Sequence, residues 1–294
     1  MKKYVFILIV ILSIIRSNAQ ENILISENEN IKIFESHISL KSDGNIWPAI
    51  YNEGIIYASN KRSNKYYFKD FDSKIIRFKT NYKYSTGPFA VYKNEIYFTG
   101  LTSSKNNIKI KNNAIYKGLI NDFEIVEIEP LTNLNPDFSF TDPSISKDGK
   151  RMIVVSNEKG YPHLLELIRN DKSEWIKGEL IYISNPKFDI LNPTIYNEKT
   201  IYFSSNISSG KILEQSYTIE NGKYIVNELK IENSHFNIYK TVKRDNIWSL
   251  PVKVEMFNSE FDDLSVIFLN EKSGYINTYR YNNSDNIYYF ELKK

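Results

Sequence analysis

Short runs in which hydrophobic and polar residues alternate recur along the chain, separated by turns of polar residues. Residues 47–60 read WPAIYNEGIIYASN, residues 87–100 read GPFAVYKNEIYFTG, and residues 192–206 read NPTIYNEKTIYFSSN. Each run joins a short hydrophobic segment to a second, aromatic-rich segment through a polar turn, which is the pattern of a β-hairpin. Tyr, Phe, Ile and Val favour strands, and we find no convincing amphipathic helix after residue 20. The pattern therefore predicts an all-β protein.

The same hairpin pattern occurs five times. Four copies open at a proline (Pro48, Pro88, Pro143 and Pro193), and a fifth opens at Asp263 without one. Successive copies are 40, 55, 50 and 70 residues apart, and units of about 40 to 50 residues are typical of four-stranded propeller blades. Two weaker strand-like segments follow the hairpin in each unit. Because stacking blades in a ring buries both faces of every sheet, we predict a β-propeller of four-stranded antiparallel blades.

The ends of the chain bear on how the ring closes and how many blades it has. The last copy lacks an outer strand, and NIKIFES at residues 30–36 has strand character. We predict that this N-terminal strand completes the sheet of the last blade. Five blades are favoured. Residues 217–231 and 236–254 are also strand-like, and they predict either an insertion in the fourth blade or a degenerate sixth blade.

Three local features are also predicted. Proline lacks an N–H group, so each repeated proline is expected at the first residue of a strand. Alternation along the second strand of the first copy places Tyr57 on one face and Ile56 on the other. The Asp148-Gly149 pair is expected to form a type I′ hairpin turn.

Two segments resemble a known repeat family. Residues 143–157, PSISKDGKRMIVVSN, resemble the PD40 repeat of WD40-like, TolB-type propellers, in which a proline precedes a strand, an Asp-Gly turn and a second strand. Residues 262–290, DDLSVIFLNEKSGYINTYRYNNSDNIYYF, are similar to the terminal repeat of propellers in Bacteroidetes cell-envelope proteins of the OmpA family. The resemblance covers about residues 40–294. It implies a propeller fold in the cell envelope, and nothing in it implies catalysis.

The N-terminal segment predicts export. Lys2 and Lys3 precede an apolar run at residues 4–15, and small residues follow at 17–19. The run has the length of the hydrophobic region of a signal peptide and is too short to cross a membrane. We predict that residues 1–19 are a cleaved signal peptide and that residues 20–294 form a single exported domain. The expected location is the periplasm or the outer membrane, or outside the cell.

Charge and cysteine content narrow the classes of function. Without the leader, 35 basic and 35 acidic side chains remain, so no positive excess favours binding of nucleic acid. The chain has no cysteine, so burial of a core must stabilise the fold without disulfides. No later apolar stretch approaches the roughly 18 residues of a membrane-spanning helix. We therefore expect no transmembrane segment.

Candidate binding residues stand just before the first strands of the repeats. Loops at these positions converge at one end of the channel of a ring, where propeller glycosidases place pairs of acids. The residues predicted to contribute to such a site are Asp43, Trp47, Asp142, Asp189, Asp262 and Asp263. The acids alternatively cap turns through their side chains. Trp47, Trp175 and Trp248 alternatively pack between blades.

Other kinds of chemistry lack a signature. His37, His163 and His235 are too few and too scattered to predict a metal site, and no cofactor motif or catalytic triad occurs. We therefore expect a non-catalytic propeller that offers its loops and channel mouth to an envelope protein. The alternative is a glycan-active or glycan-binding propeller that uses acids at the channel mouth.

Overall fold

The computed structural model describes most of the chain beyond the leader. It describes residues 23–36, 38, 44–59, 65–70, 75–80, 87–103, 111–184, 188–207, 212–220, 223–231, 235–281 and 284–293. Regular structure within these ranges is β-strand, apart from one short 3-10 helix, η1 (Glu255–Phe257). The predicted signal peptide lies outside the described residues. The all-β prediction is confirmed.

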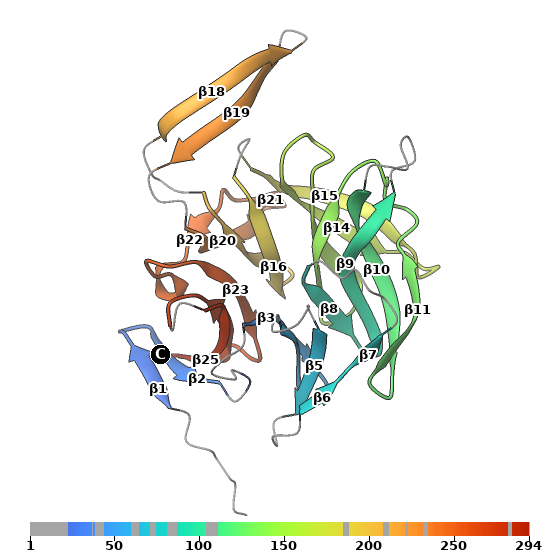
Figure 1. Ribbon diagram of the computed structural model, residues 1–294, viewed down its shortest axis with the longest axis vertical. Coiled ribbons are helices and arrows are strands. Elements are labelled where there is room, and N and C mark those ends of the chain that lie inside the picture. The colour runs from blue at the N-terminus through green and yellow to red at the C-terminus, as the bar shows by residue number, and fades with distance from the viewer. Residues whose placement is uncertain are drawn as a thin grey trace, which may run out of the picture.

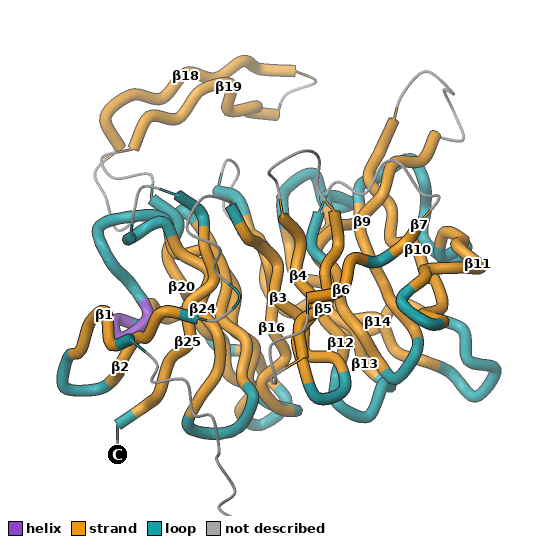
Figure 2. The backbone as a smooth tube through the Cα atoms, turned by 60° about the horizontal axis from the view of Figure 1, so that its bottom comes forward, coloured by secondary structure: helices purple, strands orange, loops and turns teal. Residues whose placement is uncertain are grey.

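Five antiparallel sheets stand around a common centre (Figures 1 and 2). Blade 1 contains β3 (Asn45–Tyr51), β4 (Gly54–Ser59), β5 (Lys65–Asp70) and β6 (Ile75–Arg77). Blade 2 contains β8 (Phe89–Tyr92), β9 (Glu95–Ser103), β10 (Lys111–Asn121) and β11 (Glu124–Pro130), with β7 (Lys79–Thr80) added in parallel to β11. Blade 3 contains β12 (Phe140–Ile145), β13 (Arg151–Ser156), β14 (His163–Arg169) and β15 (Trp175–Ile183).

Blades 4 and 5 carry the irregularities of the ring. Blade 4 contains β16 (Ile190–Asn197), β17 (Thr200–Ser205), β20 (Asn237–Arg244) and β21 (Ile247–Trp248), and β22 (Val252–Lys253) also pairs with β20. Blade 5 contains β23 (Asp263–Phe268), β24 (Ser273–Thr278), β25 (Asn286–Leu292), β2 (Ile31–Glu35) and β1 (Leu24–Glu27). The extra segment of the fourth repeat forms β18 (Ile212–Glu220) and β19 (Lys223–Ile231), a separate two-stranded sheet. Five blades are therefore confirmed, and the sixth-blade alternative is wrong.

The N-terminal strand closes the ring as predicted. Strand β2 pairs antiparallel with β25, with Ile31 opposite Leu292 and Phe34 opposite Tyr289. Ile31 and Ile33 are each 1% exposed, because they pack into the core of the last blade. Strand β1 adds a fifth, outermost strand that the sequence pattern did not predict.

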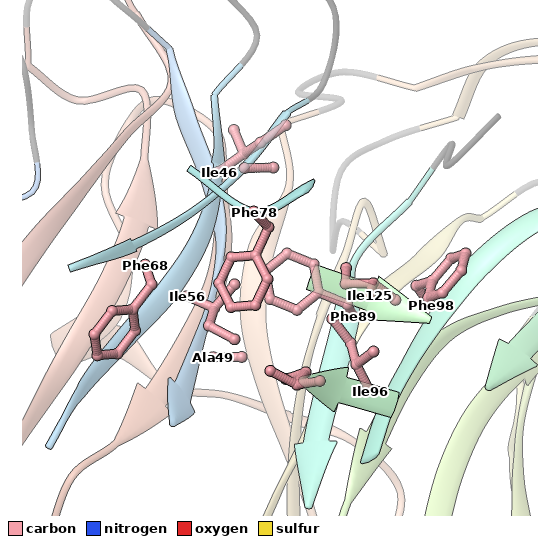
Figure 3. Packing of buried hydrophobic residues seen from close by; sticks show 11 residues of the cluster. Ile46, Ala49, Ile56, Phe68, Phe78, Phe89, Ile96, Phe98 and Ile125 are labelled. Carbon is pink, nitrogen blue, oxygen red and sulfur yellow. The ribbon is translucent and has the colours of Figure 1, made fainter. Parts of the chain in front are cut away.

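Each sheet buries both faces against its neighbours. On β4 of blade 1, Tyr57 packs in a cluster that includes Ile287 of blade 5. The preceding residue, Ile56, packs in a cluster that includes Phe89 of blade 2 (Figure 3). The alternation predicted for this strand is thus confirmed, and both of its faces are interior. Burial of these faces between blades is the main source of stability available to a chain that has no cysteine.

Charged groups also bind neighbouring blades together. Arg169 of blade 3 donates two hydrogen bonds to Glu95 of blade 2, at 2.8 Å from Nη1 to Oε2 and 2.7 Å from Nη2 to Oε1. Lys117 lies 2.8 Å from the same carboxylate, and the Tyr97 hydroxyl donates to it at 3.0 Å. Burial alone would raise the pKa of Glu95, but the hydrogen bonds from Arg169, Lys117 and Tyr97 outweigh it and lower the pKa to about 2.

The repeated prolines mark bulges in the inner strands. Trp47, Asp142 and Asn192 each precede a proline and have φ angles of 55°, 54° and 48°. At each of them the pairing with the second strand shifts register. No repeated proline is the first residue of a strand as expected: Pro88 directly precedes β8, and the three prolines after these residues lie inside their strands. A bulge leaves its extra residue out of the ladder, so a residue without an N–H group is tolerated there.

The hairpin turn of blade 3 also differs from the prediction. The N–H group of Gly149 donates to the carbonyl of Ser146 at 2.9 Å, so Lys147 and Asp148 are the central residues. A type I′ turn needs positive φ at both central residues, whereas here only the following Gly149 has one, of 72°. The side chain of Asp148 explains the preference, because it accepts bonds from the Ser146 hydroxyl at 2.5 Å and the Lys150 N–H group at 3.0 Å.

Candidate binding cavity

A central cavity of about 1100 Å³ is lined by the inner strands of all five blades. It extends from the bulges along the second half of each inner strand to the turns that lead into the second strands. Side chains that form its apolar wall are Ile50, Ala90, Val91, Ile145, Ile195, Ile267 and Phe268. Charged and other polar residues line the rest of the cavity, and a concave site that combines both kinds of lining can hold a ligand or a segment of a partner.

Polar groups lie where the bulges meet the cavity. Asn192 and Ser265 line it, and Asn192 Oδ1 and Ser265 Oγ are buried without a hydrogen-bond partner among the described residues. The Asn192 amide nitrogen donates to the carbonyl of Leu264 at 2.8 Å. The N–H group of Asn192 donates to the carboxylate of Asp142 at 3.2 Å, and the N–H group of Asp142 donates to Thr99 Oγ1 at 3.1 Å. These bonds join blades 2, 3, 4 and 5 and leave two unsatisfied polar atoms for a ligand or water.

Charged side chains at the cavity mouth are segregated by sign. The basic residues are Lys93 of blade 2 and Lys147 and Arg151 of blade 3. The acidic residues across from them are Glu198 of blade 4 and Glu271 of blade 5. Four of these five residues are exposed. Arg151 is half-buried: its Nε forms an ion pair with Glu166 Oε1 at 2.5 Å, and its Nη1 donates to the carbonyl of Glu198 at 2.9 Å, so the positive side rests on Lys93 and Lys147. The mouth therefore presents a positive side and a negative side.

Asp148 is an acidic residue on the basic side of the mouth. Its two hydrogen bonds in the turn hold its carboxylate charged, and the bond from the Ser146 hydroxyl contributes most to lowering its pKa. Asp148 thus reduces the positive charge on blade 3 but leaves Lys93 on blade 2 unopposed. The segregation of sign across the mouth remains.

Aromatic residues also line the cavity. Trp47, Tyr92 and Tyr196 all line it. A β-carbon on Gly149 would lie 2.4 Å from the ring of Tyr92, so glycine is required for this ring to sit against the turn. The ammonium of Lys93 lies 5.2 Å from the centre of the same ring, within the range of a cation–π contact.

The six predicted binding residues are not all brought together. Trp47 lines the cavity, where its backbone forms the bulge of blade 1. Asp43 lies outside the described residues. The four remaining acids, Asp142, Asp189, Asp262 and Asp263, are not among the lining residues of the cavity. Asp189 and Asp262 precede their inner strands, Asp263 begins β23, and Asp142 lies within β12 at its bulge, so all four lie away from the charged mouth.

The four described acids make structural bonds. Burial raises the pKa of Asp142, which is 5% exposed, and its carboxylate joins blade 3 to blade 4. Burial also raises the pKa of Asp189, whose N–H group donates to the side chain of Asn206 at 2.7 Å. Asp262 accepts the N–H group of Phe236 at 2.8 Å. The carboxylates of Asp142 and Asp262 thus have the capping or linking role that was the alternative interpretation, whereas the contact of Asp189 is made by its backbone.

Asp263 forms the most enclosed ion pair of the four. Its carboxylate is fully buried and lies 2.6 Å from Nη2 of Arg280. It also accepts hydrogen bonds from the hydroxyl groups of Thr278, at 2.6 Å, and Ser259, at 2.9 Å. A carboxylate with this many donors has a structural role. A binding role for the predicted acids stays a prediction.

The remaining sequence candidates have packing roles. Trp175 is 4% exposed and donates from Nε1 to the Tyr97 hydroxyl at 3.3 Å, and Trp248 donates to Glu179 at 3.1 Å. His163 is buried with Nδ1 2.9 Å from the carbonyl of Tyr161. In the part of the chain that the structure describes, no three His, Cys, Asp or Glu side chains gather as metal ligands, and no helix is long and apolar enough to span a membrane.

The charged mouth was not predicted from the sequence. Its residues lie in the turns KNE, KDGK, NEKT and NEKSG, which we interpreted only as turn formers. Their equivalent position in four repeats was the available signal, because equivalent turns of a ring converge at one mouth. Sequence reasoning instead chose the opposite ends of the inner strands.

Comparisons with known proteins support the fold. No family model and no curated protein matches the sequence. A thermostable family-43 glycoside hydrolase is 12% identical with a TM-score of 0.50, over 88% of this chain and 91% of that chain. TolB from Acinetobacter baumannii is 12% identical with a TM-score of 0.46, over 86% of this chain and 55% of TolB. The β-propeller domain of the Trilobed protease from Pyrococcus furiosus is 13% identical with a TM-score of 0.42, over 85% and 84%.

These comparisons bear on the fold and not on the activity. The chain spans about half the length of the TolB chain it matches. At 12% identity, the likeness to the family-43 glycoside hydrolase shows a shared fold and does not assign an activity.

Proposed function

We propose that this chain is a non-catalytic propeller that binds a segment of a protein partner at the mouth of its central cavity. One observation carries the proposal: an apolar cavity opens through a mouth with Lys93 and Lys147 on one side and Glu198 and Glu271 on the other. A polypeptide segment with apolar, acidic and basic side chains matches this arrangement. Complementary charge would orient the segment, and apolar burial would supply affinity.

The bonds that the predicted acids make within and between blades support a non-catalytic role. A glycosidase needs two carboxyl groups about 5 to 10 Å apart on either side of a sugar. Asp142 and Asp263 are instead buried in bonds between and within blades, and neither lines the cavity. Acids committed in this way are poorly placed to exchange protons with a substrate.

The proposed location is the cell envelope. We infer that residues 1–19 are removed and that residues 20–294 act in the periplasm, at the outer membrane or outside the cell. The resemblance of residues 262–290 to cell-envelope propellers of the OmpA family supports this location. The basic start and the apolar run at residues 4–15 support export. The mass of the protein recovered from a cell envelope fraction tests this, since cleavage predicts a chain beginning at Gln20.

The mouth of the cavity is tested by charge reversal. Residues 20–294 serve as bait for envelope extracts, beside the variants Lys93→Glu/Lys147→Glu and Glu198→Lys/Glu271→Lys. Quantitative mass spectrometry is expected to show one partner that both variants lose. The exposed turn variant Lys172→Glu is the control and should retain it. Absence of any specific partner, or a partner that both mouth variants retain, would overturn the proposal.

Glycan binding is the second candidate. Trp47, Tyr92 and Tyr196 line the cavity, and aromatic faces are surfaces on which sugar rings stack. A glycan array and a panel of polysaccharide substrates separate the two functions. Binding that Trp47→Ala abolishes, without turnover, would support a glycan receptor. Turnover that Asp142→Asn abolishes in a variant of unchanged stability would establish a glycoside hydrolase and exclude the non-catalytic proposal.

A further inference from the structure

The hairpin β18–β19 is separate from the ring. It is inserted between β17 and β20 of blade 4 and forms a sheet of its own (Figures 1 and 2). No other described strand pairs with either of its two edges. Its location is independent of the cavity mouth, because the connection from β17 to β20 lies at the opposite end of the inner strands from the charged turns.

The register of the hairpin separates apolar from polar positions. Paired residues share a face, and successive pairs alternate between the two faces. The pairs on one face are Gln215 with Leu229, Tyr217 with Val226, and Ile219 with Tyr224. The pairs on the other face are Glu214 with Lys230, Ser216 with Glu228, Thr218 with Ile225, and Glu220 with Lys223. The hairpin is therefore amphipathic.

Both faces of β18 are open to solvent. Ile219, on the apolar face, is 61% exposed. Glu214, Ser216 and Thr218, on the polar face, are also exposed. An isolated two-stranded hairpin is only marginally stable in water, and a third strand or a covered apolar face is needed to fix it. Unpaired edges of this kind accept added strands.

The two edges differ in charge. The charged residues of β18 are Glu214 and Glu220, both acidic and both on the polar face. Those of β19 are of mixed sign: Lys223, Glu228 and Lys230. A strand added to β18 with basic residues opposite its two acids would place each Glu between two Lys or Arg residues. Opposite charges on neighbouring strands stabilise a sheet.

A second copy of this chain fits the β18 edge less well. Antiparallel pairing of two β18 strands centred on Tyr217 would put Glu214 of one copy opposite Glu220 of the other. Like charges directly opposite each other are destabilising. Strand β18 carries two acids and no basic residue, so a basic strand complements its charge and a second β18 strand does not.

We propose that the outer edge of β18 binds an extended segment of a protein partner as a third strand. The segment has basic residues opposite Glu214 and Glu220, six positions apart, and apolar residues on the face of Tyr217 and Ile219. Backbone hydrogen bonds provide the general affinity of the edge, and the two basic residues provide its selectivity.

A labelled nonapeptide, TKVTVTVKT, is the probe, and TEVTVTVET is its acidic counterpart. Fluorescence anisotropy with the chain of residues 20–294 is expected to favour the basic peptide by about tenfold at low salt, with the preference reduced at high salt. Glu214→Lys/Glu220→Lys should reverse the preference. Asp171→Lys/Glu174→Lys, in an exposed turn of blade 3, is the matched control and should not change it.

Several outcomes would overturn this proposal. Equal binding of the two peptides would do so, as would an unchanged preference in Glu214→Lys/Glu220→Lys. Sedimentation that shows a dimer of the unliganded chain, lost in the same variant, would assign the edge to a second copy instead. Retention of peptide binding by Lys93→Glu/Lys147→Glu would show that this edge acts independently of the cavity mouth, whichever way the cavity proposal is decided.

Discussion

Asp285 provides a sharp test of the physical account of this ring. It lies directly before β25 and is 9% exposed. The amide of Asn277 donates to its carboxylate at 2.5 Å, and its carbonyl accepts the N–H group of Asn45 from blade 1 at 3.1 Å. Burial raises the pKa of Asp285 to about 7; the bond from Asn277 opposes the rise, and the negative charge of Asp262 adds to it.

The sign of the resulting pH dependence follows from proton binding. The ordinary pKa of this carboxyl is 3.8 and the folded value is about 7, so between these values the folded state binds more protons than the unfolded state. The free energy of unfolding should therefore fall as pH rises through this window and level off above it. A shift of about three units corresponds to about 4 kcal/mol, since each unit is worth about 1.4 kcal/mol. Relaxation around the charged carboxylate reduces this upper bound.

Asp285→Asn isolates the contribution of that carboxyl. An amide keeps an oxygen that accepts the bond from Asn277 and removes the charge. We expect the variant to match the unaltered chain below about pH 4, where the carboxyl is protonated in both states, and to be more stable by about 1 to 4 kcal/mol at about pH 8.5. Urea unfolding followed by tryptophan fluorescence across this range measures the difference. Asp171→Asn, at an exposed turn, is the control. A difference that does not change with pH, or that favours the unaltered chain at high pH, would refute the reasoning.

Three further predictions concern stability. Glu95→Gln should cost about 1 to 3 kcal/mol at neutral pH, because it leaves Arg169 without its carboxylate partner; the loss should shrink as pH falls toward about 2, where the unaltered Glu95 also becomes protonated. Ile33→Ala, in the closing strand, should cost about 2 to 5 kcal/mol in chemical denaturation, whereas Ile219→Ala on the exposed hairpin should cost almost nothing. Gly149→Ala should cost about 1 to 3 kcal/mol, because φ is 72° and the new methyl group meets an aromatic ring; unchanged thermal unfolding would contradict this.

Much of the fold could be predicted because the repeats are local patterns. The hairpin of each repeat, the number of blades and the closing strand at Ile31 all follow from alternation and spacing. The bulges could not be predicted in the same way. A proline after Trp47 or Asp142 is compatible with a strand start or a bulge, and the choice depends on pairing with the second strand.

The candidate site was less accessible to sequence reasoning. Acids before the inner strands were chosen because loops converge there, yet Asp142 and Asp263 are buried by contacts with residues far away in the chain. The segregated charges of Lys93 and Glu198 have meaning only after the ring brings their turns to one mouth. Neither fact is contained in a local pattern. Three-dimensional closure decides which polar residues are structural and which face a ligand.

The pairing of β2 with β25 has a consequence for how the molecule is made. A chain that is synthesised from its N-terminus presents the apolar residues Ile31 and Ile33 long before Leu292 emerges to pair with them. Blade 5 must then form last. Until it forms, β2 remains an unpaired strand that can pair with an edge of another chain. Nascent copies that are crowded together would be prone to exchange this strand with one another. A holding chaperone, or slow emergence of one chain at a time, would favour the correct closure.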